Sequence, residues 1–508
     1  MSDGTLFAID DPARSALDAE LAEMAVGWGR RTRVTTTVLD TFDGRLHAAG
    51  LRLDLRHDGG RRLQLSGADV PDQPLAGRTL PGRVDTMPPG SVGDVVRPLL
   101  GIRSLLAQGV VTSQRATATI IDDDGSPVTE LAIHTAVRLD ALAPVKPALL
   151  EVRALPGGRR GTRRLAAQLT GLGLPRLDAD LVAAAFAEHD RSFAGFDNFP
   201  VVPLDPDAPS AAGFRIVLSR LAVAIDANWD GTVARTDPEF LHDFRVAIRR
   251  TRTLLSAGRQ VLPDVEADQA RVRLGWLATQ TSLTRDLDVY VLEWGRYTAG
   301  LDASVVADLD PLRRLLDQRL DEEYARLAEV FAAPSARALL SDWSDWLQRS
   351  HTEVGELGHQ PLGATVAQLV LRAHRVLLQR GRLIAPDTPA EQVHDLRKDA
   401  KRLRYLLECF ASLMPADARR RFVKRLTVLQ DNLGEHQDAE VHVAQLAEFA
   451  RKLQERGVGH ETLLAIGRLT ERQDRRRSSA RRAFTDRFAE YDTKATTNLL
   501  FEAIDHIR

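Results

Sequence analysis

The chain of 508 residues is too long for one ordinary hydrophobic core and predicts two or three domains. Its 44% hydrophobic and 27% charged residues are typical of a folded protein, and its formal net charge of -2 excludes a globally basic DNA-coating protein but leaves room for a local basic patch. Aromatic residues make up only 5%, which argues against a surface that stacks single-stranded nucleic acid.

The number of cysteines and the lengths of the apolar runs indicate the cellular compartment. Cys409 is the only cysteine, so an intramolecular disulfide and a CxxC metal site are excluded, and we expect a reducing, cytoplasmic location. The start of the chain has no basic or apolar run, and no stretch approaches 18 uninterrupted apolar residues. We therefore expect neither a signal peptide nor a membrane span.

Residues 1–195 show the mixed pattern of an α+β domain. Apolar residues alternate with polar ones over 52–56 and 62–65, as they do in half-buried strands. The Asp-Gly-Gly sequence at 58–60 predicts a hairpin between these strands. A further strand, rich in Thr and Ile, is predicted at 116–121.

The pattern of apolar and polar residues changes after this region. We expect a helix at 178–195, followed by a Pro-rich linker at 196–210. From 211 to 508 the alternation stops, and apolar residues recur at spacings of three and four. This periodicity predicts an all-helical domain of many antiparallel helices.

The helical region contains an internal repeat. The sequence HDFRVAIRRTR at 242–252 aligns with HDLRKDAKRLR at 394–404, an offset of 152 residues. Keeping that offset, Asp286 falls on Asp438. One constant offset over about seventy residues predicts two similar halves, at about 211–360 and 361–508, related by a pseudo-two-fold axis.

The repeat preserves one basic helix face in each half. At about 100° per residue, positions 0, 3, 7 and 10 of each segment lie within an arc of about 80°. We call these faces the first basic arc (His242, Arg245, Arg249, Arg252) and the second basic arc (His394, Arg397, Lys401, Arg404). The opposite faces are apolar and are expected to point to the core (Phe244, Ala247, Ile248, Leu255; Leu396, Ala400, Leu403, Leu407).

A basic helix face has a simpler interpretation, that of a solvated surface. Ordinary exposed faces mix charge signs, however, because i,i+4 pairs of opposite charge stabilise a helix. Like charges one turn apart repel unless an anion occupies the face, and the pattern occurs twice in register. Glu408 interrupts the second basic arc and is a candidate partner for Arg404.

The histidines also allow two interpretations. His242 and His394 are either structural hydrogen-bonding residues or donors to a phosphate oxygen. Zinc is disfavoured, because no carboxylate or second histidine lies at ligand spacing within either arc. His436, Asp438 and His442 have a metal-like spacing, but the first half keeps only the aspartate. We therefore expect no metal or cofactor, and a structural role for the repeated aspartates, which are candidates to orient nearby arginines.

These motifs resemble the CHAD family, named for conserved histidines in an α-helical domain. The resemblance covers about 211–508, and the HxxRxxxRxxR helix is its hallmark. Residues 283–289 (LTRDLDV) and 433–438 (LGEHQD) are similar to the second motif of the family in each half. The resemblance implies two four-helix halves whose basic faces line a shared groove, binding of inorganic polyphosphate, and association with polyphosphate granules.

The N-terminal part resembles, more weakly, the CYTH or triphosphate tunnel fold, a β-barrel that often precedes CHAD. Residues 39–43 (LDTFD) are similar to its YDT-containing strand. Further matching positions are Leu46, Gly50, Arg56 and Arg115.

The metal- and phosphate-binding positions of that fold are largely changed. Residues 5–11 read TLFAIDD where the family has ExExK. Asp54 replaces an arginine, Gln64 replaces a lysine, and a late ExE pair reads Glu151 and Arg153. Paired carboxylates are needed to hold the metal for hydrolysis, so we expect no enzymatic activity.

We therefore predict a degenerate CYTH-like barrel at 1–195 followed by an all-α CHAD domain that binds polyphosphate in the cytoplasm. Two alternative functions stay open. A metal-dependent triphosphatase or phosphotransferase would use the N-terminal domain, and a nucleic-acid-binding protein would use the same basic groove; a scaffold for granule proteins is compatible with polyphosphate binding. Second-tier ligands are Arg220, Arg273, Arg372 and Arg425. The Arg-rich stretch 475–482 either extends the groove or forms a solvated helix.

Overall fold

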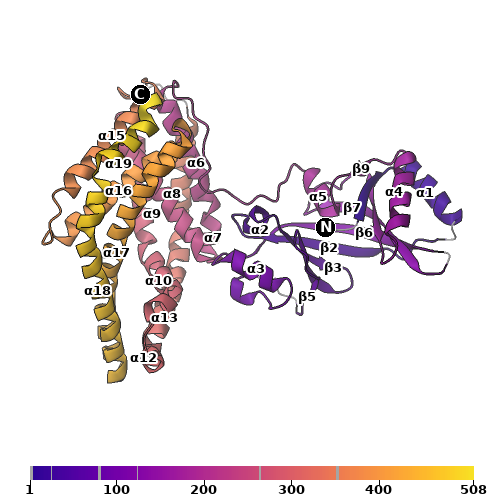
Figure 1. The fold of residues 1–508 in the computed structure, drawn as a ribbon, viewed down its shortest axis with the longest axis horizontal. Coiled ribbons are helices and arrows are strands. Elements are labelled where there is room, and N and C mark those ends of the chain that lie inside the picture. The colour runs from indigo at the N-terminus through magenta and orange to yellow at the C-terminus, as the bar shows by residue number, and fades with distance from the viewer. Residues whose placement is uncertain are drawn as a thin grey trace. The chain divides into compact units, whose positions relative to one another are not determined.

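The structure is a computed structural model that describes residues 4–23, 26–77, 82–122, 124–262, 265–349 and 354–507. The chain folds into two compact units, divided between Asp197 and Asn198 (Figure 1). The first unit is built on a sheet and the second is entirely helical. No helix in the described ranges combines the length and the apolar character needed to cross a bilayer.

One nine-stranded antiparallel sheet organises the first unit. The expected barrel takes the form of a continuous sheet with strand order β5-β4-β3-β2-β6-β7-β8-β1-β9, so β5 and β9 stand at its two ends. The strands are β1 (Gly4–Ile9), β2 (Thr32–Asp40), β3 (Arg52–His57), β4 (Arg61–Ser66), β5 (Gln73–Pro74), β6 (Leu106–Ile121), β7 (Pro127–Leu139), β8 (Ala148–Ala154) and β9 (Arg176–Leu177). The predicted hairpin is confirmed, since β3 pairs with β4 and Gly59 takes a positive φ of 103° in the turn.

Helices cover both faces of this sheet. They are α1 (Asp11–Glu23), α2 (Arg45–Ala48), α3 (Gly93–Leu100), α4 (Arg159–Gly171) and α5 (Leu181–Ala187). Phe7 of β1 packs in one cluster with apolar residues of α1 and α4, whereas its neighbour Leu6 packs in another with residues of α5. Adjacent residues of a strand point to opposite faces, so α1 and α4 lie on one face of the sheet and α5 on the other.

The expected helix at 178–195 is wrong at both ends. Helix α5 begins after Asp180, whose carboxylate accepts a hydrogen bond of 2.9 Å from the Ala183 N–H. It ends at Ala187, and Asp190 takes a positive φ of 52°, which a helix does not allow. Residues 188–195 therefore form a loop.

The second unit contains two consecutive sets of helices (Figure 1). The first set is α6 (Ser210–Ala227), α7 (Trp229–Val233), α8 (Pro238–Ala257), α9 (Val265–Gln280), α10 (Ser282–Leu292), α11 (Trp294–Thr298), α12 (Ala303–Asp308), α13 (Asp310–Ala332) and α14 (Pro334–Gln348). The second set is α15 (Leu362–Gly381), α16 (Ala390–Cys409), α17 (Ala416–Glu455), α18 (His460–Tyr491) and α19 (Lys494–Ile504).

The helices follow the repeat found in the sequence. Both ends of α8 are separated from those of α16 by the predicted 152 residues, and α6 and α15 begin at the same offset. The copies differ where α9 and α10 of the first half correspond to the single 40-residue helix α17. The break lies at Thr281, whose hydroxyl bonds back to the carbonyls of Leu277 and Ala278.

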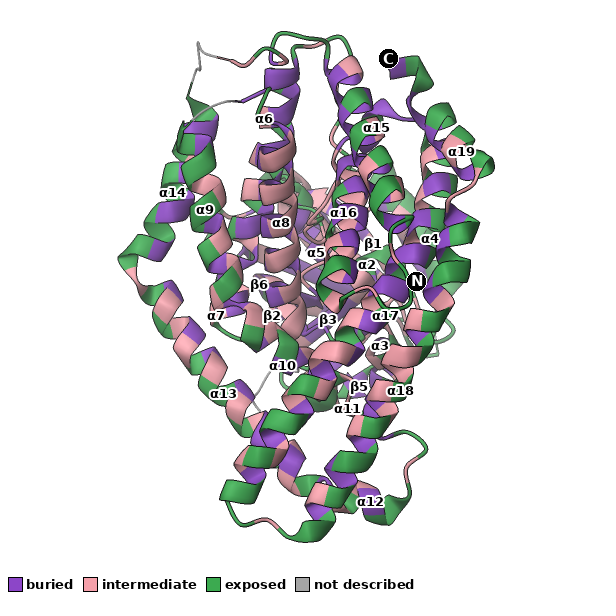
Figure 2. Ribbon diagram, turned by 90° about the vertical axis from the view of Figure 1, so that its left-hand side faces the viewer, coloured by how far each residue is buried: buried purple, intermediate pink, exposed green. Residues whose placement is uncertain are grey.

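One hydrophobic cluster spans the two halves, and we call it the shared core. Its buried residues come from α6, α8, α9 and α14 of the first half and from α15 to α19 of the second. Figure 2 shows buried residues recurring along these helices, between intermediate and exposed ones. Equivalent positions also meet directly: Pro209 pairs with Pro361 in an isolated β-bridge, and the rings of Tyr290 and His442 lie 4.3 Å apart. These contacts mark the pseudo-two-fold axis.

Part of the predicted linker is fixed to the helical unit. The Asn198 amide donates a hydrogen bond of 3.0 Å to Asp243, and the Arg250 guanidinium lies 4.0 Å from the centre of the Phe199 ring. Phe199 also packs against the shared core. The helical unit therefore begins at Asn198, before the first helix.

We predict that fragment 198–508 folds alone and is more stable than fragment 211–508. The shorter fragment lacks the Phe199 ring and its cation–π contact, which together contribute roughly 1–3 kcal/mol to the free energy of unfolding. Urea denaturation followed by circular dichroism would measure the difference. Phe199→Ala in the longer fragment should reproduce most of the loss, and equal unfolding midpoints for both fragments would contradict the prediction.

Candidate functional site

Helices α8 and α16 carry the two basic arcs, and their apolar faces fix them in the core. Helix α8 begins at Pro238, and the preceding Asp237 carboxylate accepts hydrogen bonds from the N–H groups of Glu239 and Phe240. The apolar faces predicted from the sequence are buried without exception (Phe244, Ala247, Ile248, Leu255; Leu396, Ala400, Leu403, Leu407). Their burial directs the opposite faces, and with them both arcs, away from the core.

The arcs are not ordinary solvated helix faces. All eight of their residues are half-buried, whereas Lys398 and Arg402, which lie on α16 outside the arc, are exposed. The Nε atoms of Arg249, Arg252 and Arg397 are buried and have no hydrogen-bond partner among the described residues. Buried donors of this kind normally find an acceptor, so these arginines are candidates for contact with a ligand.

Arg249 and Lys401, which are equivalent in the repeat, approach each other from the two halves. Burial and, after it, the positive charges of Arg397, Arg249 and Arg245 lower the pKa of Lys401 to about 7, against the opposing effect of Asp438. Neither Arg249 nor Lys401 forms a hydrogen bond or ion pair within the described part of the chain. The two arcs therefore converge on one cluster of like charges.

The neighbouring arc residues are partly used by the protein itself. Arg245 donates to the Ala278 carbonyl at 2.7 Å and to the Thr281 hydroxyl at 2.6 Å, which seals the break between α9 and α10. Burial, followed by the charge of Arg249, lowers the pKa of Arg245 to about 10. Arg397 donates to Asp438 at 3.1 Å, so this repeated aspartate orients an arginine.

The last residues of the two arcs have different surroundings. Arg404 donates to Glu408 at 2.6 Å, and Glu408 also accepts a hydrogen bond of 2.5 Å from Arg250. The carboxylate that interrupts the second basic arc therefore joins arginines of both halves. Arg252 instead packs against Gly275 of α9, where a Cβ atom would lie 3.2 Å from its guanidinium.

The histidines have structural partners. His242 is half-buried, and His394 forms a hydrogen bond of 2.8 Å with Gln437 through Nδ1. His442 is enclosed by Tyr290 and Tyr297, and burial lowers its pKa to about 4, so it is neutral near pH 7. No three side chains of the metal-binding types gather in the residues that the structure describes.

A large polar cavity opens from the second basic arc. It has a volume of about 830 Å³ and lies among α11, α16, α17 and α18. Its basic lining residues are Arg296, Arg397, Lys401, Arg404, Arg476 and Arg487. Its acidic lining residues are Asp431, Glu435 and Asp438, so the formal charges give a positive excess.

Comparison with known families identifies this unit. Residues 216–447, which include both arcs and the greater part of the cavity lining, match the CHAD domain family. The helical unit contains a CHAD domain.

Solved structures include similar proteins. The CHAD domain from the plant Ricinus communis is 24% identical, with coverage of 57% of this chain and 95% of that chain and a TM-score of 0.48. PptA from Streptomyces chartreusis is 18% identical, with coverage of 56% and 100% and a TM-score of 0.44. A candidate adenylate cyclase from Bacillus halodurans is 15% identical, with coverage of 35% and 94% and a TM-score of 0.27. None of the curated proteins matches the chain.

The Arg-rich stretch of α18 divides between the two roles expected for it. Arg476 lines the cavity of the CHAD domain, whereas Arg475 and Arg477 pair with Glu471 and Asp474 of their own helix. Arg476 is aligned with Ala480, Ala483 and Arg487 at the spacing of one helix face, a signal available in the sequence. Arg296 of α11 is in neither arc, and no repeat or motif marks it.

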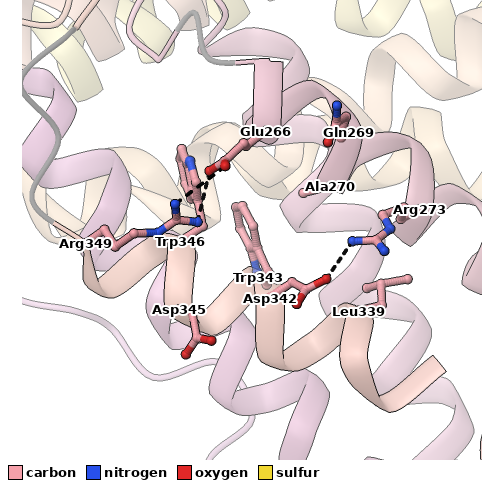
Figure 3. Close-up of a pocket in the computed structure, with 10 residues that line it drawn as sticks. All are labelled: Glu266, Gln269, Ala270, Arg273, Leu339, Asp342, Trp343, Asp345, Trp346 and Arg349. Carbon is pink, nitrogen blue, oxygen red and sulfur yellow. Dashed lines mark hydrogen bonds and ion pairs between the residues drawn. The ribbon is translucent and has the colours of Figure 1, made fainter. Parts of the chain in front are cut away.

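The second-tier arginines do not belong to this cavity. Arg220, Arg273, Arg372 and Arg425 are all exposed, and none of them lines it. Arg273 pairs with Asp342 at 2.9 Å in a separate pocket between α9 and α14, beside the stacked rings of Trp343 and Trp346 (Figure 3). Arg425 contacts Thr496 of α19, and Arg372 lines a groove near the end of α8.

In the N-terminal unit, the charged residues of the sheet neutralise one another. Glu130 accepts hydrogen bonds from Arg115 at 2.6 Å and from Arg153 at 2.7 Å. A second network joins Arg52 to Asp54 and Asp180. His134, whose Nε2 atom lies 3.6 Å from the Glu151 carboxylate, lowers the pKa of Glu151. In the cleft of about 270 Å³ that these residues line, Arg52, Asp54, Arg153 and Asp180 thus have partners of opposite charge, whereas Arg56 donates to Gln64.

We predict that Lys401→Met stabilises the protein at neutral pH. The folded pKa of about 7 lies below the ordinary value of 10.5, so unfolding takes up a proton between these values. The resulting penalty on the folded state grows as pH falls from about 10.5 to 7 and is constant below. Methionine removes it, which should raise the melting temperature by about 2–4 °C at pH 7 but not near pH 11.

The matched control is Lys398→Met on the same helix, where the lysine is exposed and pairs with Asp395. This change should bring no comparable gain. A melting temperature that rises equally at both pH values in the Lys401→Met variant would show that packing, and not charge, is responsible.

Proposed function

We propose that this protein binds inorganic polyphosphate through its CHAD domain, at the cluster where the two basic arcs converge, and that it associates with polyphosphate granules by this contact. The observation that carries the proposal is the meeting of Arg249 and Lys401, neither of which forms an ion pair or hydrogen bond within the described residues. The family resemblance of the domain supports the same ligand.

The electrostatics of the cluster favour a polyanion. The depressed pKa of Lys401 reports the cost of adding another positive charge to a half-buried site that already contains three nearby arginines. A phosphate chain supplies the missing negative charge and favours the protonated lysine. Arginine adds planar pairs of donors that match phosphate oxygens, and lysine adds a compact charge.

The shape of the site suits a polymer better than a single phosphate. The cavity extends from the cluster toward Arg296, Arg476 and Arg487, so several phosphates of one chain find cations. A chain held at one end is presented to the remaining cations at high effective concentration.

The lining of the cavity favours polyphosphate over single-stranded nucleic acid. Its lining residues include no Phe, Tyr or Trp, and bases gain affinity by stacking on such side chains. We therefore propose that nucleic acid is the weaker ligand.

We also propose that the N-terminal unit is not a triphosphatase. Glu130 is paired with Arg115 and Arg153, and Asp54 and Asp180 are paired with Arg52. Metal-dependent hydrolysis requires carboxylates that are free to bind the ion.

We predict that Arg249→Glu and Lys401→Glu each weaken polyphosphate binding severely, by roughly 100-fold or more at low salt. Each variant should also make the dependence of affinity on salt concentration shallower, because fewer counterions are released. The double variant should lose less than the sum of the two free-energy changes, since both side chains act on one polymer. Titration with long-chain polyphosphate at several salt concentrations would measure these effects.

The matched control is the double variant Arg220→Glu, Arg425→Glu, which reverses two exposed arginines outside the cavity. It should retain nearly full affinity. If the cluster variants stay folded and bind with unchanged affinity and slope, the arcs are not the binding site. Single-stranded DNA that competes as well as polyphosphate would favour the nucleic-acid function.

We predict no turnover of ATP or tripolyphosphate by the purified protein in the presence of Mg²⁺ or Mn²⁺. The physical reason is the pairing of the carboxylates in the sheet with arginines. Phosphate release would be measured directly. Robust release that is lost on Glu151→Gln or Arg56→Ala would contradict the proposal.

A further inference from the structure

A second groove lies between the C-terminal end of α8 and helices α15 and α16. Its lining includes Arg252, the last residue of the first basic arc, but neither Arg249 nor Lys401. It consists of two adjoining depressions of about 410 Å³ and 330 Å³, which share Ser256, Asp399 and Arg402 as lining residues. Its apolar lining consists of Ala257, Leu369, Ala373, Val376 and Leu406. Cations surround these residues, and Arg402 is among the exposed ones.

The internal repeat relates this groove to a place that is already filled. At the offset of 152 residues, Arg402 corresponds to Arg250, and Asp395 corresponds to Asp243. In the same way, Arg380 corresponds to Asn228. The repeat relates α15 to α6, α16 to α8, and the end of α8 to the end of α16. The groove is therefore the pseudo-symmetric equivalent of the surface formed by α6, α8 and the end of α16.

The occupant of that equivalent surface is the chain itself. Phe199 packs on the shared core, and the Arg250 guanidinium lies 4.0 Å from the centre of its ring. The Asn198 side chain donates to Asp243 at 3.0 Å and accepts a hydrogen bond from Asn228. An extended segment with one aromatic side chain thus fits this surface.

The open groove keeps the apolar floor but carries more positive charge. Ser256 replaces Glu408, Lys398 replaces Val246, and Arg380 replaces Asn228. Arg252, Arg372 and Arg402 have no hydrogen-bond or ion-pair partner in the ranges that the structure describes. Asp395 and Asp399 are the acidic lining residues, and they pair with Lys398 and Arg380.

We propose that this groove binds an extended, acidic peptide segment of a partner protein, with an aromatic side chain seated beneath Arg402. The ring packs on Leu369, Ala373 and Leu406, as Phe199 packs in the equivalent place. Acidic residues on either side of the ring pair with Arg372 and Arg252. The apolar floor favours a peptide over polyphosphate, because a phosphate chain gains nothing from apolar contact.

The test uses the full chain and a fluorescein-labelled peptide of residues 196–204 that carries Phe196→Glu, Val201→Glu and Val202→Glu. Fluorescence anisotropy should show saturable binding. Adding Phe199→Ala to the peptide should weaken binding by roughly 10-fold, as expected for an aromatic anchor. Arg402→Glu in the protein should weaken it at least as much, whereas Arg375→Glu, an exposed arginine of α15 outside the groove, should leave it within about twofold.

Polyphosphate titrations of the same variants separate this groove from the cluster. Arg402→Glu should leave polyphosphate affinity within about twofold while it removes peptide binding. Absence of saturable peptide binding up to about 1 mM overturns the proposal. So does an Arg402→Glu variant that loses polyphosphate affinity but not peptide affinity, which would assign the groove to the polymer. Self-association of the protein that Arg402→Glu abolishes would assign it to a second copy and also overturn the proposal.

Discussion

Repulsion between like charges at the pseudo-two-fold axis is the constraint on which the helical unit depends. Arg249 and Lys401 are brought together although each disfavours the charge of the other. The opposing term is hydrophobic, because α8 and α16 each bury four apolar side chains of the face opposite the arc. Full burial of one Leu, Ile or Phe side chain contributes about 1.5–3 kcal/mol to the free energy of unfolding. The two faces bury several of them and together outweigh the repulsion. The core thus holds the cations in an arrangement that they would not adopt alone.

The repeat explains how this arrangement arises from a short stretch of sequence. Two copies that share a core must place equivalent surfaces next to the axis, and the basic arcs are such surfaces. Each helix needs only a few correctly spaced cations to form the cluster, because the pseudo-two-fold symmetry places the cations of the other helix beside them. Tyr290 and His442 show the same effect in a neutral pair, where ring contact replaces repulsion.

Periodicity predicted those features that depend on a single element. The apolar and basic faces of α8 and α16, the β3–β4 hairpin and the Arg404–Glu408 pair follow from spacing along one helix or strand. Features that depend on tertiary packing were not predictable in this way. Arg296 of α11 lines the cavity together with residues of α16, α17 and α18, which lie far from it in the sequence. Arg273 lies outside the cavity and pairs with Asp342 of α14. Local capping by Asp180 likewise decided where α5 begins.

The break at Thr281 shows that the two copies have specialised. In the first half, Arg245 fills the gap between α9 and α10 with its own hydrogen bonds, so a cation of the repeat has become part of the scaffold. In the second half, α17 runs without interruption and forms a wall of the cavity. Equivalent substitutions in the two copies therefore have unequal consequences. Loss of Arg245 removes its hydrogen bonds to the Ala278 carbonyl and the Thr281 hydroxyl at the break, whereas loss of Arg397 removes only its pair with the exposed carboxylate of Asp438. Of the two copies, the first therefore uses its arc arginine to hold the helices together, and the second leaves its arc open to the cavity.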